Sequence, residues 1–265
     1  MKCREVEDVL VTSNMKGIGK LTPSVRAHIE ACRRCREFAR IAELPAADIH
    51  VDASRIAHLQ KMIAGNLRPV RPLPPSWVFL LTFMLFFVAL SCAGVLYLGP
   101  YGWFLLMPGQ KLAVFTTLAA SAALLAFSLA RQMVPGQKSL LRPGFLPIGL
   151  FVLLCLTVAS VFQVRTDPHF LQSGETCLRA GLPYAIPAAL AFWWILRRGA
   201  ILSPRVTGAT TGMLAGLVSM TVLEVHCTNL NVWHILVWHV GFALLGLMAG
   251  LLVAAAGQAI HNRVS

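Results

Sequence analysis

The sequence predicts an all-α protein with two parts, a small helical N-terminal domain and a six-helix transmembrane bundle. Of the 265 residues, 57% are hydrophobic and only 13% are charged, and the mean hydropathy of +0.68 is typical of a membrane protein. The charged residues concentrate at the start. Residues 1–76 contain 13 Lys and Arg and 8 Asp and Glu, against 10 and 3 in residues 77–265. A polar head therefore precedes a hydrophobic body.

The body contains six apolar segments of the length that a bilayer requires, roughly 20 residues of helix each. Pro183 and Pro187 fall inside the fourth segment and are expected to kink it. The first long apolar run begins near Trp77, so we expect no signal peptide. We divide the chain into a head at 1–47, a helix and Pro-rich linker at 48–76, and a membrane body at 77–265. The predicted spans are 77–98, 112–130, 145–163, 178–196, 206–225 and 235–256.

The basic residues between these segments predict the orientation of the body. They concentrate in two alternate loops, and such loops face the cytoplasm. Both termini are then cytoplasmic, in a reducing compartment. The same bias accounts for the pI near 10, so we expect no direct nucleic-acid partner. The basic residues are Arg131, Lys138 and Arg142 in one loop and Arg197, Arg198 and Arg205 in the other.

The head contains a metal-ligand motif, His28-x-x-x-Cys32-x-x-Cys35. On a helix these three side chains fall on one face. A structural zinc site needs four N or S ligands, and Cys3 is the nearest fourth. We predict one Zn²⁺ held by Cys3, His28, Cys32 and Cys35. The alternatives are a redox-active Cys-x-x-Cys pair without metal, or two accidental thiols beside a surface histidine.

Short helices should surround this motif. Residues 4–13 alternate in a helical pattern, which Gly17 and Gly19 interrupt. Thr22 and Pro23 read as the N-cap and first turn of a second helix. We expect that helix to run from Pro23 through Cys35 and to continue to about residue 44.

A further amphipathic helix is expected from about residue 48 to residue 67. Its apolar residues recur at intervals of three and four, so they lie close to one face. Either this face packs on the head or it binds a partner protein. Residues 68–76 contain four prolines and form a stiff extended linker. The apolar face consists of Ile49, Ile56, Leu59, Met62 and Ile63.

Over residues 1–44, the head resembles the zinc-binding anti-sigma family. The resemblance rests on an upstream Cys3, a helix-breaking segment and the run HIEACRRC. It departs from the family at Arg33-Arg34, where a proline is common. The resemblance implies that the zinc domain and the following helix wrap a bacterial sigma factor and hide its polymerase-binding surface.

The body resembles a different group, the six-span inner-membrane negative regulators of sigma factor F. The resemblance is strongest over residues 177–241, in CLRAGLPYA, LRRGAILSP, GATTGMLAG, VHC and the run to VWHVG. Both resemblances imply a membrane-anchored anti-sigma factor of the bacterial inner membrane. Its partner would be an extracytoplasmic-function (ECF) sigma factor. We therefore expect a stress-response regulator of transcription and not an enzyme.

Two other functions compete with this interpretation. A small transporter or membrane enzyme with a regulatory zinc head would need ionisable groups in mid-span. Glu224 is the one acidic residue in the predicted spans and lies near a segment end, and His239 makes a poor relay alone. A DNA-binding zinc finger would need a helix free to enter the major groove. A solvated face better explains the basic residues Arg33, Arg34, Arg36 and Arg40.

A possible sensor lies at the outer membrane face. Cys177 begins the fourth span and Cys227 follows the fifth, so two antiparallel helices bring both thiols to the same side. His226 adjoins Cys227. We predict Cys177, Cys227 and His226 as a periplasmic sensor of oxidants or thiophilic metals. The alternatives are a static disulfide or plain apolar packing.

Glycines repeat every four residues in the last two spans. They are Gly208, Gly212 and Gly216 in the fifth span and Gly246 and Gly250 in the sixth. Small residues at this spacing let membrane helices approach closely. We expect them to pack the two spans within one chain and not to drive dimerisation.

Overall fold

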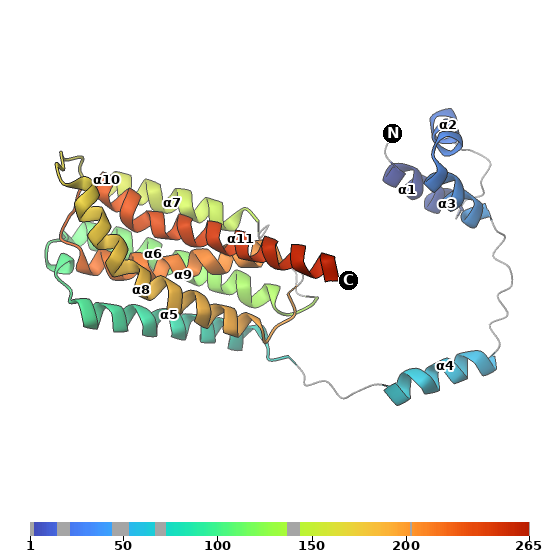
Figure 1. Ribbon diagram of the computed structural model, residues 1–265, viewed down its shortest axis with the longest axis horizontal. Coiled ribbons are helices and arrows are strands. Elements are labelled where there is room, and N and C mark those ends of the chain that lie inside the picture. Colours follow the sequence, from blue (N-terminus) through green and yellow to red (C-terminus); the bar gives the residue numbers. More distant parts are fainter. Residues whose placement is uncertain are drawn as a thin grey trace. The chain divides into compact units, whose positions relative to one another are not determined.

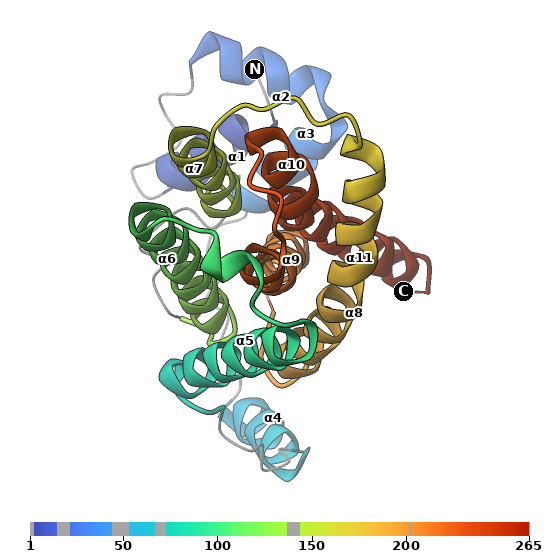
Figure 2. The ribbon, with the colours of Figure 1, turned by 90° about the vertical axis from the view of Figure 1, so that its left-hand side faces the viewer.

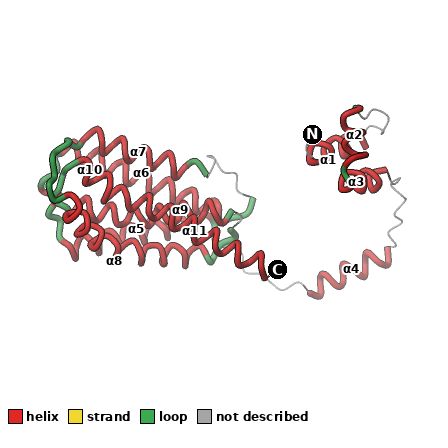
Figure 3. The backbone as a smooth tube through the Cα atoms, turned by 45° about the horizontal axis from the view of Figure 1, so that its top comes forward, coloured by secondary structure: helices red, strands yellow, loops and turns green. Residues whose placement is uncertain are grey.

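The computed structural model describes residues 3–14, 22–43, 53–66, 73–136, 144–201 and 203–264. Within these ranges every element is a helix, apart from one isolated bridge between Gln163 and Asn231. The tube in Figure 3 shows helices and loops without a strand. The chain divides into two compact units, residues 1–70 and residues 71–265. The all-α class that the sequence predicts is confirmed over these residues (Figure 1).

The head is built from three short helices, α1 (Cys3–Asn14), α2 (Pro23–Ala31) and α3 (Arg33–Glu43). Its buried apolar side chains, among the head residues described, are Val6, Leu10, Val25, Cys35 and Ala39. Arg34 of α3 pairs with Glu7 of α1 at 2.9 Å, but the arginine is largely exposed, so the pair contributes at most about 1 kcal/mol. A core this small rarely stabilises a domain by itself and usually needs a metal or disulfide.

One head helix differs from its prediction. The predicted start at Pro23 is confirmed, with Thr22 in extended conformation before it. The continuous helix from Pro23 through Cys35 is wrong, because α2 ends at Ala31 and Cys32 adopts an extended conformation. Cys32 donates its backbone N–H to the His28 carbonyl at 2.9 Å and accepts from the Arg36 N–H at 3.0 Å. The break therefore keeps the backbone hydrogen-bonded while the chain changes direction at a ligand position.

Helix α4 (Ala53–Asn66) lies within the amphipathic helix that the sequence predicts. Ile49 falls outside the described residues. The other apolar residues of the predicted face are markedly exposed for side chains of their type. The exposed fractions are 41% for Ile56, 55% for Leu59, 52% for Met62 and 60% for Ile63.

The body consists of long helices that coincide with the six predicted apolar segments. The first five are α5 (Ser76–Leu98), α6 (Pro108–Gln132), α7 (Leu146–Val161), α8 (Phe170–Leu196) and α9 (Pro204–His226). The sixth is continuous but composite, with one turn of α10 (Val232–His234), the π-helix η3 (Ile235–Val240) and α11 (Gly241–Val264). A short 3₁₀ turn, η2 (Gly102–Phe104), follows α5.

Four of these helices are long and apolar enough to cross a membrane: α5, α6, α9 and the composite helix over Val232–Ile260. Helix α7 is apolar but has only 16 residues. Helix α8 begins two turns before the predicted span, in a polar stretch where Arg179 pairs with Glu175 at 2.6 Å. The chain is therefore a membrane protein by helix length and composition.

Helix α9 forms the centre of the body. The end-on view in Figure 2 shows it surrounded by α5, α6, α7, α8 and α11. Nearly all of its residues from Thr210 to Val225 are buried. Because the surrounding helices shield it from lipid, α9 accommodates threonines, a serine and Glu224.

Backbone contact joins α9 to α11. A Cβ atom added to Gly212 would lie 1.9 Å from the Gly246 carbonyl oxygen, and one added to Gly216 would lie 2.1 Å from the Phe242 oxygen. In return, a Cβ on Gly250 would lie 2.0 Å from the Gly208 oxygen. We call this row of contacts the glycine seam. The predicted intramolecular packing of the two spans is confirmed.

Adding a single methyl group at the glycine seam should force α9 and α11 apart. Gly212→Ala should destabilise the body by about 1–3 kcal/mol, because the clash is with backbone and the two helices must separate. Gly149→Ala in α7 is the matched control, since its Cβ would meet nothing within 4 Å. The control should be neutral or slightly stabilising, as alanine is the better helix former. Thermal unfolding of the purified protein in detergent compares them, and equal transitions would contradict the seam.

Two candidate metal centres

Two groups of cysteine and histidine side chains converge in the described part of the chain. In each, four ligand atoms, one from each residue, lie within 4.8 Å of one another. The head centre consists of Cys3, His28, Cys32 and Cys35, and the body centre consists of Cys177, Cys227, His234 and His239.

The head centre contains all four residues that the sequence predicts as zinc ligands. Cys3 Sγ lies 3.7 Å from His28 Nε2 and 3.8 Å from Cys32 Sγ. Cys3 begins α1, His28 lies in α2, Cys32 occupies the break and Cys35 lies in the first turn of α3. Each of the three head helices thus supplies a ligand.

These distances fit a tetrahedral zinc ion. With Zn–S near 2.3 Å and Zn–N near 2.0–2.1 Å, two sulfurs lie about 3.8 Å apart and a sulfur and a nitrogen about 3.6 Å apart. Three sulfurs and one imidazole match the Cys₃His composition of structural zinc sites. The residues present therefore fit the ion that the motif predicts.

The two cysteines of the Cys-x-x-Cys pair occupy different environments. The Cys35 backbone N–H at the start of α3, and then the Cys3 thiol, lower the pKa of Cys32. Burial, and then hydrogen bonding to Cys3 and Cys32, raises the pKa of Cys35 to about 12. The three thiols lie within hydrogen-bonding distance of one another. Binding of a divalent cation would release their protons, because metal-bound cysteines are thiolates.

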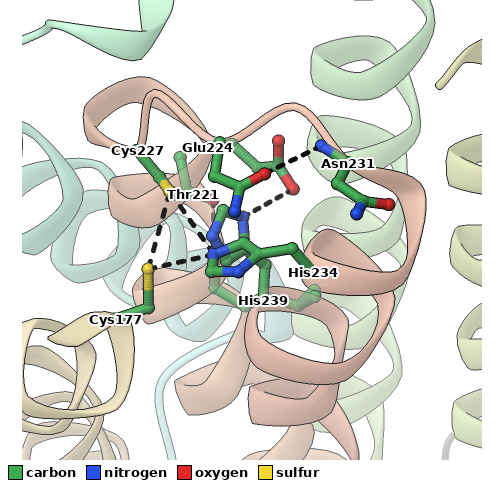
Figure 4. A network of polar contacts seen from close by, with 9 residues as sticks. Cys177, Thr221, Glu224, Cys227, Asn231, His234 and His239 are labelled. Atoms are coloured by element: carbon green, nitrogen blue, oxygen red, sulfur yellow. Dashed lines mark hydrogen bonds and ion pairs between the residues drawn. The ribbon is translucent and has the colours of Figure 1, made fainter. Parts of the chain in front are cut away.

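The body centre forms at the end of the bundle where α10 lies in Figure 1, and Figure 4 shows its four side chains converging from close by. Cys177 comes from α8, Cys227 follows α9, His234 ends α10 and His239 lies in η3. The two thiols lie 3.5 Å apart, and His234 Nε2 lies 3.3 Å from Cys177 Sγ and 3.5 Å from Cys227 Sγ. The thiols are not bonded to each other, as a disulfide would place the sulfurs about 2.05 Å apart.

Glycines in α8 allow Cys177 to reach the other ligands. Gly174 and Gly181 lie three and four residues from Cys177, on the same side of α8. A Cβ at Gly174 would lie 1.9 Å from the Trp238 ring, and one at Gly181 would lie 2.5 Å from the Phe242 ring. Helix α8 therefore lies directly against the composite helix at the level of the cysteine.

The π-helix brings the two histidines together. His234 and His239 are five residues apart, a spacing that places side chains on different sides of an α-helix. The wider turn of η3 overcomes this, and the imidazole centroids lie 5.3 Å apart with their planes at 83°.

Hydrogen bonds hold the far side of each imidazole. His239 Nδ1 lies 3.1 Å from Glu224 Oε1, and both side chains are about 1% exposed. His234 Nδ1 lies 3.3 Å from Ser173 Oγ, which donates to Asp167. The Asn229 amide donates to Asp167 at 2.8 Å and holds the pKa of that carboxyl below its usual range.

His226, which the sequence groups with the two cysteines, lies outside this centre. Its Nδ1 lies 3.1 Å from the Gly99 carbonyl oxygen at the end of α5, and its ring meets Tyr101 edge-on. His234 is not among the residues that the sequence predicts for this site, and His239 is considered there only as an isolated histidine of the last span. The one sequence feature that indicates a polar partner for His239 is Glu224, an acidic residue in an apolar span 15 residues earlier.

Comparison with known proteins identifies the body. The chain matches no curated protein and no solved structure. A family model described as negative regulator of sigma F matches residues 63–259. The match begins within α4 and includes the whole body centre, while the four residues of the head centre lie outside it. Because the match covers most of the chain, the protein belongs to the family of negative regulators of sigma F.

Proposed function

We propose that this protein is an anti-sigma factor anchored in the bacterial inner membrane. Its cytoplasmic head binds zinc and sequesters an ECF sigma factor, and an extracytoplasmic redox or metal stress causes release. The observation that carries the proposal is the family match over residues 63–259, which implies a sigma-factor partner. The converging ligands of the head and the exposed face of α4 support the finer parts.

The side chains at both ends of the bundle support six spans. Arg197 lies over Trp193 with 4.9 Å between the guanidinium carbon and the ring centroid, and Arg198 lies over Trp194 at 3.6 Å. Tryptophan and tyrosine gather at membrane interfaces, and arginine extends from there toward the cytoplasm. The end of α8 thus has the character of a cytoplasmic interface. Exposed aromatic residues at the opposite end of the bundle include Tyr97, Tyr101 and Trp233.

Zinc in the head is proposed as the main source of its folding free energy. Three short helices with a small apolar core meet at the ligands, and structural zinc in such domains contributes on the order of 10 kcal/mol. The ion would hold together α1, the break at Cys32 and α3.

Removing one head ligand should test this role. Cys32→Ser in the full-length protein should lower the bound zinc by one ion per chain and make residues 1–43 sensitive to protease, because α1 and α3 lose their shared ion. Cys92→Ser is the control, since Cys92 is an exposed thiol of α5 outside both centres. Elemental analysis and limited proteolysis measure the two effects. A protease-resistant Cys32→Ser head with unchanged zinc content would refute the zinc role.

The apolar face of α4 is proposed as the main contact with the sigma factor. A helix bound in a groove uses apolar anchors at intervals of three and four residues. Ile56, Leu59 and Ile63 have this spacing and are exposed, which favours a partner protein over packing within the head. Met62, and by its place in the pattern Ile49, complete the proposed set.

Charges placed on this face should release the sigma factor. Ile56→Asp with Leu59→Asp should raise transcription of the sigma-dependent genes to nearly the level of a deletion strain, while the head keeps its zinc. Gln60→Asp adds one negative charge at an exposed polar position of α4 and should leave repression intact. A reporter gene with the sigma-dependent promoter makes the comparison. Deletion of the protein without any change in transcription would rule out the function altogether.

The extracytoplasmic sensor is proposed at Cys177 and Cys227, with His226 linking it to α5. Two thiols 3.5 Å apart can form a disulfide by losing two protons and two electrons to an oxidant, or can bind a soft metal ion. His226 adjoins Cys227 and contacts the carbonyl of Gly99, at the end of α5. A change at Cys227 would thus be passed to the helix that continues, through the linker, to the head.

Loss of either thiol should abolish the response. Cys177→Ser and Cys227→Ser should each leave basal repression in place but prevent induction by oxidants and by thiophilic metals such as Cd²⁺. Cys155→Ser in α7 should respond normally, because this cysteine belongs to neither centre. The same reporter, measured before and after exposure, gives the result. Full induction in both serine variants would exclude the two cysteines as the sensor.

A further inference from the structure

We infer that Cys177, Cys227, His234 and His239 form a tetrahedral site for a divalent d¹⁰ ion such as Zn²⁺, with Glu224 as a positioning residue. The inference deepens the proposed sensor by naming its ligand set, and it rests on the proposed function only for its biological role. All five residues of the site belong to the body.

The distances between ligand atoms match those around a bound ion. A tetrahedral zinc site separates two sulfurs by about 3.8 Å and a sulfur from a nitrogen by about 3.6 Å. The observed separations are 3.5 Å between the thiols and 3.3 and 3.5 Å from them to His234 Nε2. Side chains from α8, from the turn after α9 and from the composite helix therefore already surround a volume of the right size.

The orientation of the His239 imidazole adds independent evidence. A histidine that binds metal through one nitrogen usually donates its other N–H to a carboxylate, a backbone carbonyl or a water molecule. His239 has this arrangement, with Nδ1 on Glu224. Its Nε2 is buried and has no hydrogen-bond partner among the described residues, an arrangement that needs an explanation in a native protein. A metal ion on Nε2 would satisfy that nitrogen and would explain why α9 carries a buried glutamate.

Charge and burial select the class of ion. Two thiolates balance a divalent cation, so the ion and its sulfur ligands are neutral together, which lowers the cost of burial. Thiolate with imidazole in a tetrahedral set is typical of zinc and its heavier relatives, and carboxylate-preferring Mg²⁺ or Ca²⁺ would find no oxygen ligand within the set.

The π-helix is the element that completes the ligand set. In an α-helical register, His234 and His239 would diverge, and the site would keep one imidazole. π-helical turns are rare and frequently occur at functional sites. The structure thus places an unfavourable turn where two ligands need to converge.

The test uses the full-length chain in detergent with Cys32→Ser, which disables the head centre. After removal of metal under reducing conditions, the protein is titrated with Cd²⁺ and with Co²⁺. We expect one ion per chain, a thiolate-to-Cd²⁺ charge-transfer absorption, and strong visible Co²⁺ bands of a tetrahedral complex. The wild-type chain, with both centres, should bind two.

Variants of the same background assign the residues. Glu224→Gln should retain the tetrahedral Co²⁺ spectrum while binding 10- to 100-fold more weakly, because the ligands remain but His239 loses its carboxylate. His234→Gln and His239→Gln should change the spectrum and weaken binding further. His226→Gln is the matched control and should bind as the parent does, since His226 contacts Gly99 instead.

Titration of the parent chain tests the site even if a variant misfolds. Absence of Cd²⁺ binding by the folded, reduced parent would overturn the site. Unchanged affinity and spectrum in His239→Gln would overturn the ligand set. None of these measurements involves a sigma factor, so they stand apart from a failure of the anti-sigma function, which the reporter assay would reveal.

Discussion

The body depends on direct backbone contact between its central helix and its last helix. Carbonyl groups of Phe242, Gly246 and Gly250 occupy the space that side chains would fill on the facing glycines of α9. In a membrane, where apolar side chains gain little by leaving lipid, such close contact is a principal source of helix association. The helices around α9 keep it out of reach of lipid. Thr210 and Thr211 bond to carbonyls of their own helix, and Glu224 is held within protein.

The two candidate metal centres use the same residue types but are assembled differently. Three residues of the head centre lie within eight consecutive positions, so local chain geometry brings them together. Only Cys3 is distant in sequence. The body centre takes one ligand from α8, one from the turn after α9 and two from the composite helix. Its formation therefore requires the whole bundle, and above all the approach of α8 that Gly174 and Gly181 permit.

This difference explains what could be predicted from the sequence. Hydropathy predicts the long helices of the body, and spacing predicts which four head residues the structure brings together. The break at Cys32 was missed because His28, Cys32 and Cys35 also satisfy the periodicity of an unbroken helix. His239 was missed for the converse reason: a spacing of five fits no face of an α-helix, and nothing local reveals a π turn. Helix α8 begins earlier than the predicted span. Hydropathy does not reveal its first turns because they are polar.

The π turn also fixes the rotational register of the last helix. An α-helix advances about 100° and about 1.5 Å for each residue. If η3 were to become α-helical, everything beyond it would be turned by roughly that angle relative to His234. Gly246 and Gly250 would then leave the surface of α9, and side chains would meet the backbone where glycines do now. Two sets of contacts therefore fix the rotation of the last helix. The two imidazoles hold its beginning, and Gly246 and Gly250 hold it against α9 further along. A change in the π turn would therefore rotate α11, unless the glycine seam prevents the rotation. A rotation would reach Gln258 at the opposite end of the bundle, where its side chain accepts a hydrogen bond from Arg205 at 2.9 Å.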